Sequence, residues 1–376
     1  MRVNLSFSFR DVWNGIRFSF SFKKLWVQLQ GIILGTILYS IFSYLSLLVS
    51  GISFKEIWNY WHFIPLPFGE GISLLGKILL SIGIILFIVS IYIYSVAVGK
   101  ITFEQLRGDE FYEVGDSVKF ARKKGWPVIT APLSILFVIV FILLLGVILG
   151  LFGKVPYLGE FILLIFAIPA IVMCFFLVYL FIALIFSLFL GPAVVSSTES
   201  DTFDTLFEAF STLNEQPFRF ILYEFYVSII AIFTTSLFAW ALGRAAWIMD
   251  KVLSASWLMG VKFRTIVDIA KSYLPFSPGF SLLYTIFKFL GIEGILNIGY
   301  APNAPITLHI VGFLFGIGLY IMIFLVLAQY INAWTVGTLI SYLIIVKKKD
   351  DFDLLEIKKE ETESVTEEKK EEKTDE

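Results

Sequence analysis

The chain has 376 residues, of which 58% are hydrophobic and only 16% are charged, and its mean hydropathy is +0.84. A soluble domain of this length does not carry so much apolar surface, so the composition excludes a water-soluble globular protein and indicates a polytopic membrane protein. The formal net charge of −2 is unevenly distributed, because residues 347–376 contain more acidic residues than lysines.

Residues 1–24 interleave basic with aromatic side chains. A signal peptide would have its apolar core within this stretch, but here the apolar run comes later and is too long, so we expect a retained, basic aromatic arm at the membrane interface. A second basic group lies between the second and third apolar runs. Contacts with anionic lipid headgroups are predicted for Arg10, Arg17, Lys23, Lys24, Lys119, Arg122, Lys123 and Lys124. Ordinary charge flanking a membrane span explains these residues equally well.

Six apolar runs are each long enough to cross a bilayer as a helix of about twenty residues. They lie near residues 25–50, 73–98, 128–152, 161–190, 220–242 and 307–346, which defines a six-span membrane domain over 25–346. The basic residues favour one side of these spans. By the positive-inside rule, we expect a multi-pass protein of a cytoplasmic (inner) membrane with both termini in the cytoplasm.

Two segments fall outside this pattern. Residues 243–305 form an outer insertion, in which we expect short helices near 247–258, 261–273 and 280–290; re-entrant segments or further crossings there remain open. Residues 347–376 have almost no apolar content and are predicted to form a disordered, acidic cytoplasmic tail.

A segment between the fourth and fifth spans has the pattern of an amphipathic helix. Its apolar residues follow helical spacing and form one stripe: Phe203, Leu206, Phe207, Phe210 and Leu213. We expect this helix to lie in the interface and to turn the chain into the span that begins after Pro217. Similar segments at 11–20 and 113–122 precede the first and third spans. The three segments indicate either a threefold parallel repeat of elbow helix and hairpin, or three unrelated amphipathic helices.

Two stretches carry a resemblance to known proteins. The segment GPAVVSSTESDTFDTLFEAFSTLNEQPFRF (191–220) and the closing helix AWTVGTLISYLIIVKKKDD (333–351) resemble a group of poorly characterised bacterial polytopic membrane proteins. This group includes the membrane domain fused to some glycerophosphodiester phosphodiesterases. The resemblance implies an all-α membrane fold but no reaction, because the chain lacks the soluble phosphodiesterase domain.

The most informative ionisable residue is Glu224. It lies five residues after Arg219, hence roughly 7.5 Å into the fifth span. A carboxylate at that depth is either a proton or cation site, or an interfacial group that bonds a neighbour such as Arg219; we favour the second. Gln329 and Asn332 in the last span complete the candidate polar site. They are expected to form interhelical hydrogen bonds, and a polar translocation path is the alternative.

Other features are weaker. The glycine pairs Gly31/Gly35, Gly146/Gly150 and Gly312/Gly316 have small-xxx-small spacing, which favours close helix contact within the chain or in an oligomer. Cys174, the only cysteine, is expected to be a packing residue. The two histidines lack neighbouring ligands, so we expect no metal and no cofactor.

The predicted function follows by elimination. We expect a non-enzymatic scaffold, accessory subunit or membrane-organising protein that contacts membrane lipids and either a protein partner or further copies of itself, and that does not bind nucleic acid. The alternative is a transporter or channel for a hydrophobic or lipid-like substrate. A lipid-processing enzyme comes third, because no nucleophile or set of metal ligands converges in the sequence.

Overall fold

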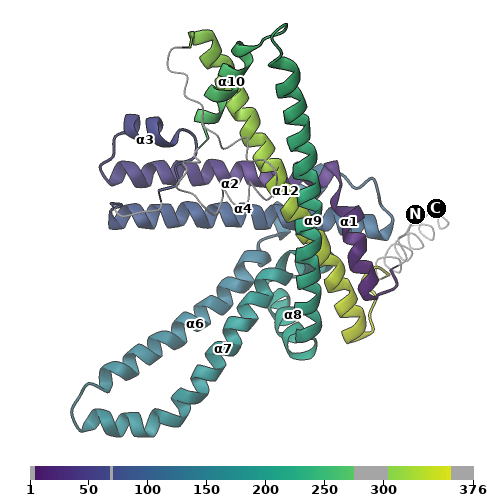
Figure 1. The fold of residues 1–376 in the computed structure, drawn as a ribbon. Helices are drawn as coiled ribbons and strands as arrows, with labels where there is room; N and C mark the ends of the chain where they lie inside the picture. The colour runs from purple at the N-terminus through teal and green to yellow at the C-terminus, as the bar shows by residue number, and fades with distance from the viewer. Residues whose placement is uncertain (1–4, 68–70, 275–303, 357–376) are drawn as a thin grey trace, which may run out of the picture. The chain divides into compact units, whose positions relative to one another are not determined.

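The computed structural model describes residues 5–67, 71–274 and 304–356, and within these ranges all regular secondary structure is helical (Figure 1). The elements in chain order are η1 (Phe9–Trp13), α1 (Asn14–Ser19), α2 (Phe22–Val49), α3 (Phe54–Trp61), α4 (Leu74–Arg107), α5 (Val114–Lys124), α6 (Pro127–Phe152), α7 (Leu158–Thr198), α8 (Thr202–Glu215), α9 (Pro217–Leu253), α10 (Val261–Ser272) and α12 (Ile306–Asp350). In the described ranges, six helical segments are long and apolar enough to span a membrane. The predicted all-α polytopic fold is confirmed.

Several spanning helices extend beyond the predicted apolar runs. Helix α4 continues to Arg107, α7 to Thr198 and α9 to Leu253. The separate short helix expected near 247–258 is not present, because residues 247–253 continue α9 and residues 254–258 form turns. Residues 244–253 contain no proline or glycine that would end α9, so the helix continues through them. The short helix expected at 261–273 is present as α10, whereas 280–290 and 357–376 lie outside the described residues.

Short helices precede three of the spans, at the positions where elbow helices are expected: η1 with α1 before α2, α5 before α6, and α8 before α9. Local chemistry sets the corners. Pro127 and Pro217 occupy the first positions of α6 and α9, where a missing backbone N–H costs nothing. A Cβ added at Gly125 would lie 2.2 Å from the Ala121 carbonyl oxygen, so only glycine fits the end of α5. At the start of α8, the Asp201 side chain accepts a hydrogen bond from the Asp204 N–H.

The chain divides into two compact units. Unit 1 comprises Met1–Gly15, Ser95–Val227 and Thr335–Glu376, and unit 2 comprises Ile16–Tyr94 and Ser228–Trp334. Helices α5 to α8 lie wholly in unit 1, whereas α2, α3 and α10 lie wholly in unit 2.

Unit 1 is built around a helical hairpin of α6 and α7 (Figure 1). Ile135 and Ile139 of α6 pack against Leu180 and Ala183 of α7. The apolar stripe of α8 is divided between two environments. Its Leu206, Phe210 and Leu213 pack against this hairpin core, while Phe203 and Phe207 are exposed. Helix α8 is therefore held by protein on one edge of its stripe and leaves the other edge open.

In unit 2, four helices share one apolar core. Leu25, Leu29 and Ile32 of α2 pack with Ala328 and Ile331 of α12, and side chains of α4 and α9 cover this cluster. Glycines allow the closest approaches between helices. A Cβ added at Gly31 would lie 2.6 Å from the Tyr94 Cβ, and one added at Gly312 would lie 2.5 Å from the Ile269 side chain. The helices are in contact at these glycines, so larger residues do not fit there.

Helix α7 corrects one expectation. Cys174 is exposed on its surface and is not a buried packing residue. The reason is that the most apolar part of α7 is almost entirely uncovered by protein, so a side chain in the middle of this span faces the surroundings.

Candidate functional site

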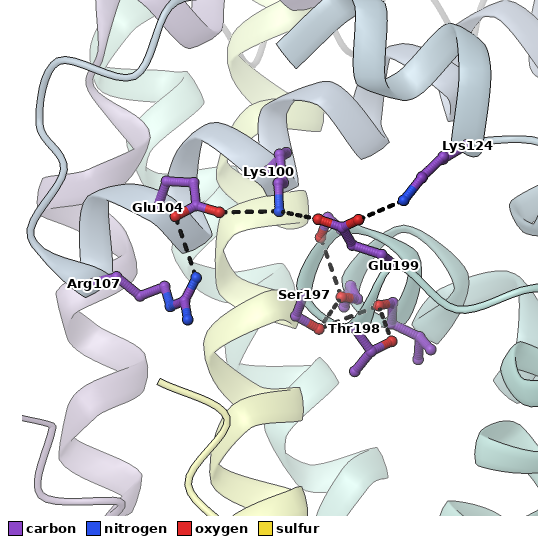
Figure 2. Close-up of polar contacts among 10 residues, drawn as sticks. Lys100, Glu104, Arg107, Lys124, Ser197, Thr198 and Glu199 are labelled. Atoms are coloured by element: carbon purple, nitrogen blue, oxygen red, sulfur yellow. Dashed lines mark hydrogen bonds and ion pairs between the residues drawn. The ribbon is translucent and has the colours of Figure 1, made fainter. Parts of the chain in front are cut away.

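A chain of charged side chains links three helices of unit 1 (Figure 2). The Lys100 ammonium of α4 lies 3.0 Å from a carboxylate oxygen of Glu104 and 3.0 Å from one of Glu199, which follows α7. The second carboxylate oxygen of Glu199 accepts a hydrogen bond of 2.7 Å from Lys124 at the end of α5. Arg107 lies 3.5 Å from Glu104. These five residues, which we call the charged network, join α4, α5 and the end of α7.

Lys100 is the buried centre of the charged network. Its side chain is only 4% exposed, and its ammonium lies 4.9 Å from the ring centroid of Phe120 and 5.7 Å from that of Phe103. A buried ammonium needs compensating charge, which the two carboxylates supply, and the aromatic faces add a weaker attraction. The network therefore stabilises a cation that burial would otherwise disfavour.

Glu199 occupies a costly backbone position. Its φ of 56° and ψ of 25° place it in the left-handed region at the end of α7, where glycine is the usual residue. A carboxylate there also faces the negative end of the helix dipole. Two lysines offset both costs. Glycine would adopt the same backbone without strain but could not bridge Lys100 and Lys124.

The electrostatics of this site favour the ionised carboxylate. Partial burial by itself raises the pKa of Glu199, but the hydrogen bonds from Lys124 and Lys100 and their positive charges outweigh it and lower the pKa to about 2. The pKa of nearby Tyr112 is shifted in the opposite direction. Burial and the negative charges of Glu104, Asp116, Glu199 and Asp109 raise the pKa of Tyr112 to about 12, so this phenol stays neutral.

A second polar clamp holds α8 to the end of α12. The Lys349 ammonium, whose side chain is 2% exposed, donates to Glu208 at 2.7 Å and to the Ser211 hydroxyl at 2.9 Å. Glu208 and Ser211 belong to the amphipathic segment that the sequence predicts to be an elbow. The clamp ties this elbow to the last span of unit 1.

Glu224 lies in α9 of unit 1 and is 7% exposed. One of its carboxylate oxygens accepts a hydrogen bond of 3.1 Å from the Thr338 hydroxyl of α12. A Cβ added at neighbouring Gly337 would lie 2.6 Å from the Val227 side chain, so α9 and α12 are in close contact there. Arg219 is partly buried on the same helix. The carboxylate thus takes part in the packing of α9 against α12.

The other two members of the predicted polar site lie in unit 2. Gln329 and Asn332 are both buried in α12. Within the described part of the chain, neither the amide nitrogen nor the amide oxygen of the Asn332 side chain has a hydrogen-bond partner, and the Gln329 amide nitrogen has none either. The interhelical hydrogen bonds predicted for Asn332 are therefore not found among the described residues. Glu224 and its partner Thr338 belong to unit 1, whereas Gln329 and Asn332 belong to unit 2.

Most of the lysines and arginines predicted to contact lipid headgroups are exposed. These are Arg10, Arg17, Lys23, Lys119, Arg122, Lys123 and Lys124. Lys124 also pairs with Glu199. Lys24 differs, since it is fully buried and its ammonium donates to the Phe18 carbonyl oxygen at 2.9 Å. The structure gives Lys24 this internal partner in place of the predicted headgroup contact.

Sequence reasoning missed Glu199 and Lys349. The partners of Glu199 lie 99 and 75 residues away along the chain, and no local pattern connects them. An acid directly after an apolar run was the available signal. Lys349 belongs to a run of three lysines that looks like ordinary flanking charge, and only packing distinguishes the buried member.

Comparison with known proteins found no matching family model, no matching curated protein and no matching solved structure. The resemblance to phosphodiesterase-linked membrane domains therefore stays a prediction. Within the described ranges, no three residues among His, Cys, Asp and Glu gather as a metal site would require. The arrangement that is present joins helices through ion pairs and close packing.

Proposed function

We propose that this polytopic membrane protein is a non-enzymatic scaffold, which associates with a second copy of itself through the α6–α7 hairpin. The proposal rests on the different surroundings of the three glycine pairs. Gly31/Gly35 and Gly312/Gly316 are filled by neighbouring side chains or backbone of the same chain. A Cβ added at Gly146 or Gly150 of α6 would meet nothing within 4 Å.

An open small-xxx-small pair on a membrane span is a surface on which a second helix can approach closely. Its surroundings support association. The most apolar window of α7 is 0% buried, against 17–33% for the corresponding windows of the other candidate spans. The hairpin thus offers a large apolar surface that the described part of the chain leaves uncovered. Association between copies would cover the glycine pair and give the hairpin a structural role.

The native cysteine makes the proposal testable. Cys174 is exposed on α7, and it is the only cysteine in the chain. Copies labelled there with a donor or an acceptor fluorophore would be mixed in phospholipid vesicles, and energy transfer followed as lipid dilutes the protein. We expect Gly150→Ile to weaken self-association about tenfold, because the branched side chain prevents close approach.

Gly318→Ile is the matched control. Gly318 also lies in a span with open space around its Cβ position, but it has no small residue four positions away. We expect this variant to associate like the parent chain. Energy transfer no greater than that of a non-associating membrane protein at the same dilution, or equal loss in both variants, would refute self-association through α6.

The cytoplasmic membrane is the proposed location, with both termini in the cytoplasm and the exposed basic side chains near anionic headgroups. Support comes from α5, whose Lys119, Arg122 and Lys123 are exposed on a short helix that precedes a span. Each such cation contributes about 1 kcal/mol of attraction to an anionic leaflet.

A transporter or channel for a hydrophobic or lipid-like substrate is the second candidate. Glu224 favours it, because a carboxylate that is 7% exposed within a spanning helix is costly and usually marks a site. One of its carboxylate oxygens also accepts a hydrogen bond from Thr338 of α12, so Glu224 contributes to helix packing, and the scaffold is preferred.

A further inference from the structure

A groove opens in unit 2 between α2, the segment that follows α3, and α12. Its volume is about 640 Å³. Helix α2 contributes one wall, including Ile37 and Ile41, and α12 contributes another, including Tyr320 and Phe324. Phe63 closes the groove between them. Its walls are mainly aliphatic and aromatic, with the small hydroxyl residues Thr36 and Ser40 on the α2 side.

The aromatic wall is held in place by hydrogen bonds to the backbone. The Tyr44 hydroxyl donates to the His62 carbonyl oxygen, and the Tyr320 hydroxyl donates to the Tyr273 carbonyl oxygen at 2.9 Å. The ring of Phe63 packs edge-on against that of Tyr320, with centroids 5.8 Å apart. Since both tyrosine hydroxyls already have acceptors, the tyrosines offer the groove mainly apolar ring surface. The wall is preformed and apolar.

We propose that this groove binds one hydrocarbon chain of a bilayer lipid. The choice of occupant rests on continuity with the lipid-facing surface. Ile37, Ile41 and Leu45 line the groove and are also 52%, 50% and 42% exposed, and Ile317 opposite them is exposed as well. These side chains lie on candidate membrane spans, where the surrounding medium is lipid hydrocarbon. A chain already in the bilayer enters this groove without crossing water.

The dimensions of the groove agree with a lipid chain. From Thr36 to Leu45, α2 rises roughly 13 Å, close to the ~15 Å of hydrocarbon in one leaflet. Helix α3, which precedes one end of the groove, carries Trp58 and the exposed Tyr60. Such aromatic residues lie at headgroup level. The chain would therefore enter beside α3 and run along α2 towards Thr36.

The test uses the full chain in phosphatidylcholine vesicles that contain a phosphatidylcholine with a diazirine in its acyl chain. After irradiation, labelled peptides are mapped by mass spectrometry. The reference is the exposed face of α9 around residues 225–237, whose side chains do not line the groove and lie outside the proposed α6–α7 interface. We expect labelling of residues 36–45 and 317–324 to exceed this reference about threefold, because packing against fixed rings prolongs contact.

Filling the groove should remove the preference. Ser40→Trp places a large ring inside it and should reduce labelling there to the level of the α9 reference. Ser81→Trp is the matched control, since Ser81 is an exposed serine of the neighbouring span α4 outside the groove. Uniform labelling of the parent chain would show only ordinary boundary lipid and would overturn the proposal, and this comparison needs no variant to fold. Labelling that survives Ser40→Trp in a folded protein would overturn it as well.

Discussion

Replacement of Glu199 by glutamine tests whether the charged network stabilises the fold. Glutamine keeps the size and the left-handed backbone but removes the charge. The bond from buried Lys100 is of the charge-assisted kind that contributes about 1.5–3 kcal/mol, and the bond from half-exposed Lys124 contributes about 0.2–1 kcal/mol. Lys100 keeps Glu104 as a partner, which reduces the loss. We expect Glu199→Gln to lower the free energy of unfolding by about 1–3 kcal/mol.

The pH dependence gives a sharper test. The pKa of Glu199 is lowered from 4.5 to about 2 in the folded chain. The folded state therefore holds the proton less tightly than the unfolded state, and the carboxylate contributes its full stability above about pH 4.5. This contribution is lost as the pH falls from about 4.5 to about 2. The stability difference between the parent chain and Glu199→Gln should close over that interval.

Thermal unfolding in mild detergent, followed by tryptophan fluorescence, measures this difference. Glu160→Gln is the matched control, because Glu160 lies exposed at the opposite end of the same helix. We expect a small effect there. A Glu199→Gln variant as stable as the parent chain at neutral pH, or a stability gap that stays constant down to about pH 2, would refute the role assigned to the charged network.

Two further substitutions test the other polar contacts. Lys349→Met should lower the free energy of unfolding by about 1–3 kcal/mol, because Glu208 loses its buried counter-charge. Adding Glu208→Gln should restore part of this loss in thermal unfolding. If the effects of the two substitutions simply added, the clamp would be contradicted. Glu224→Gln should change the free energy of unfolding by less than about 1 kcal/mol, since the amide oxygen still accepts a hydrogen bond from Thr338. It should also leave the proton permeability of reconstituted vesicles unchanged. A protein-dependent proton flux that this variant abolishes would favour the transporter.

Much of the fold could be predicted from the sequence because its signals are local. A continuous apolar run reports a span wherever it occurs, and Pro127 and Pro217 mark the starts of two spanning helices. The stripe of α8 was also visible. Its division between a packed edge at Leu206 and an open edge at Phe207 was not, because both positions are equally apolar. The continuation of α9 to Leu253, in contrast, agrees with a local signal, because residues 244–253 contain no proline or glycine.

The candidate site was harder to predict, because it depends on contacts between distant segments. Glu224 was identified from its depth, and its partner Thr338 lies 114 residues away. Glu199 was missed for the same reason. Asn332 shows the opposite error, since an amide in a span suggests an interhelical bond that the described residues do not form. The residue type indicates which hydrogen bonds or ion pairs a side chain can form, but only the packing of the helices determines which partner lies within reach.

The glycine pairs show why lipid as the solvent limits such predictions. In water, an apolar helix face must be buried, so the pattern of apolar residues reveals which face contacts protein. In a bilayer, a leucine side chain has nearly the same free energy next to lipid as next to protein. Hydropathy therefore locates a span but not its neighbours. Close approach at small residues and paired charges carry the remaining information. Gly31 and Gly150 look alike in the sequence, yet one meets Tyr94 and the other meets nothing. That difference makes α6 the span on which association should be sought.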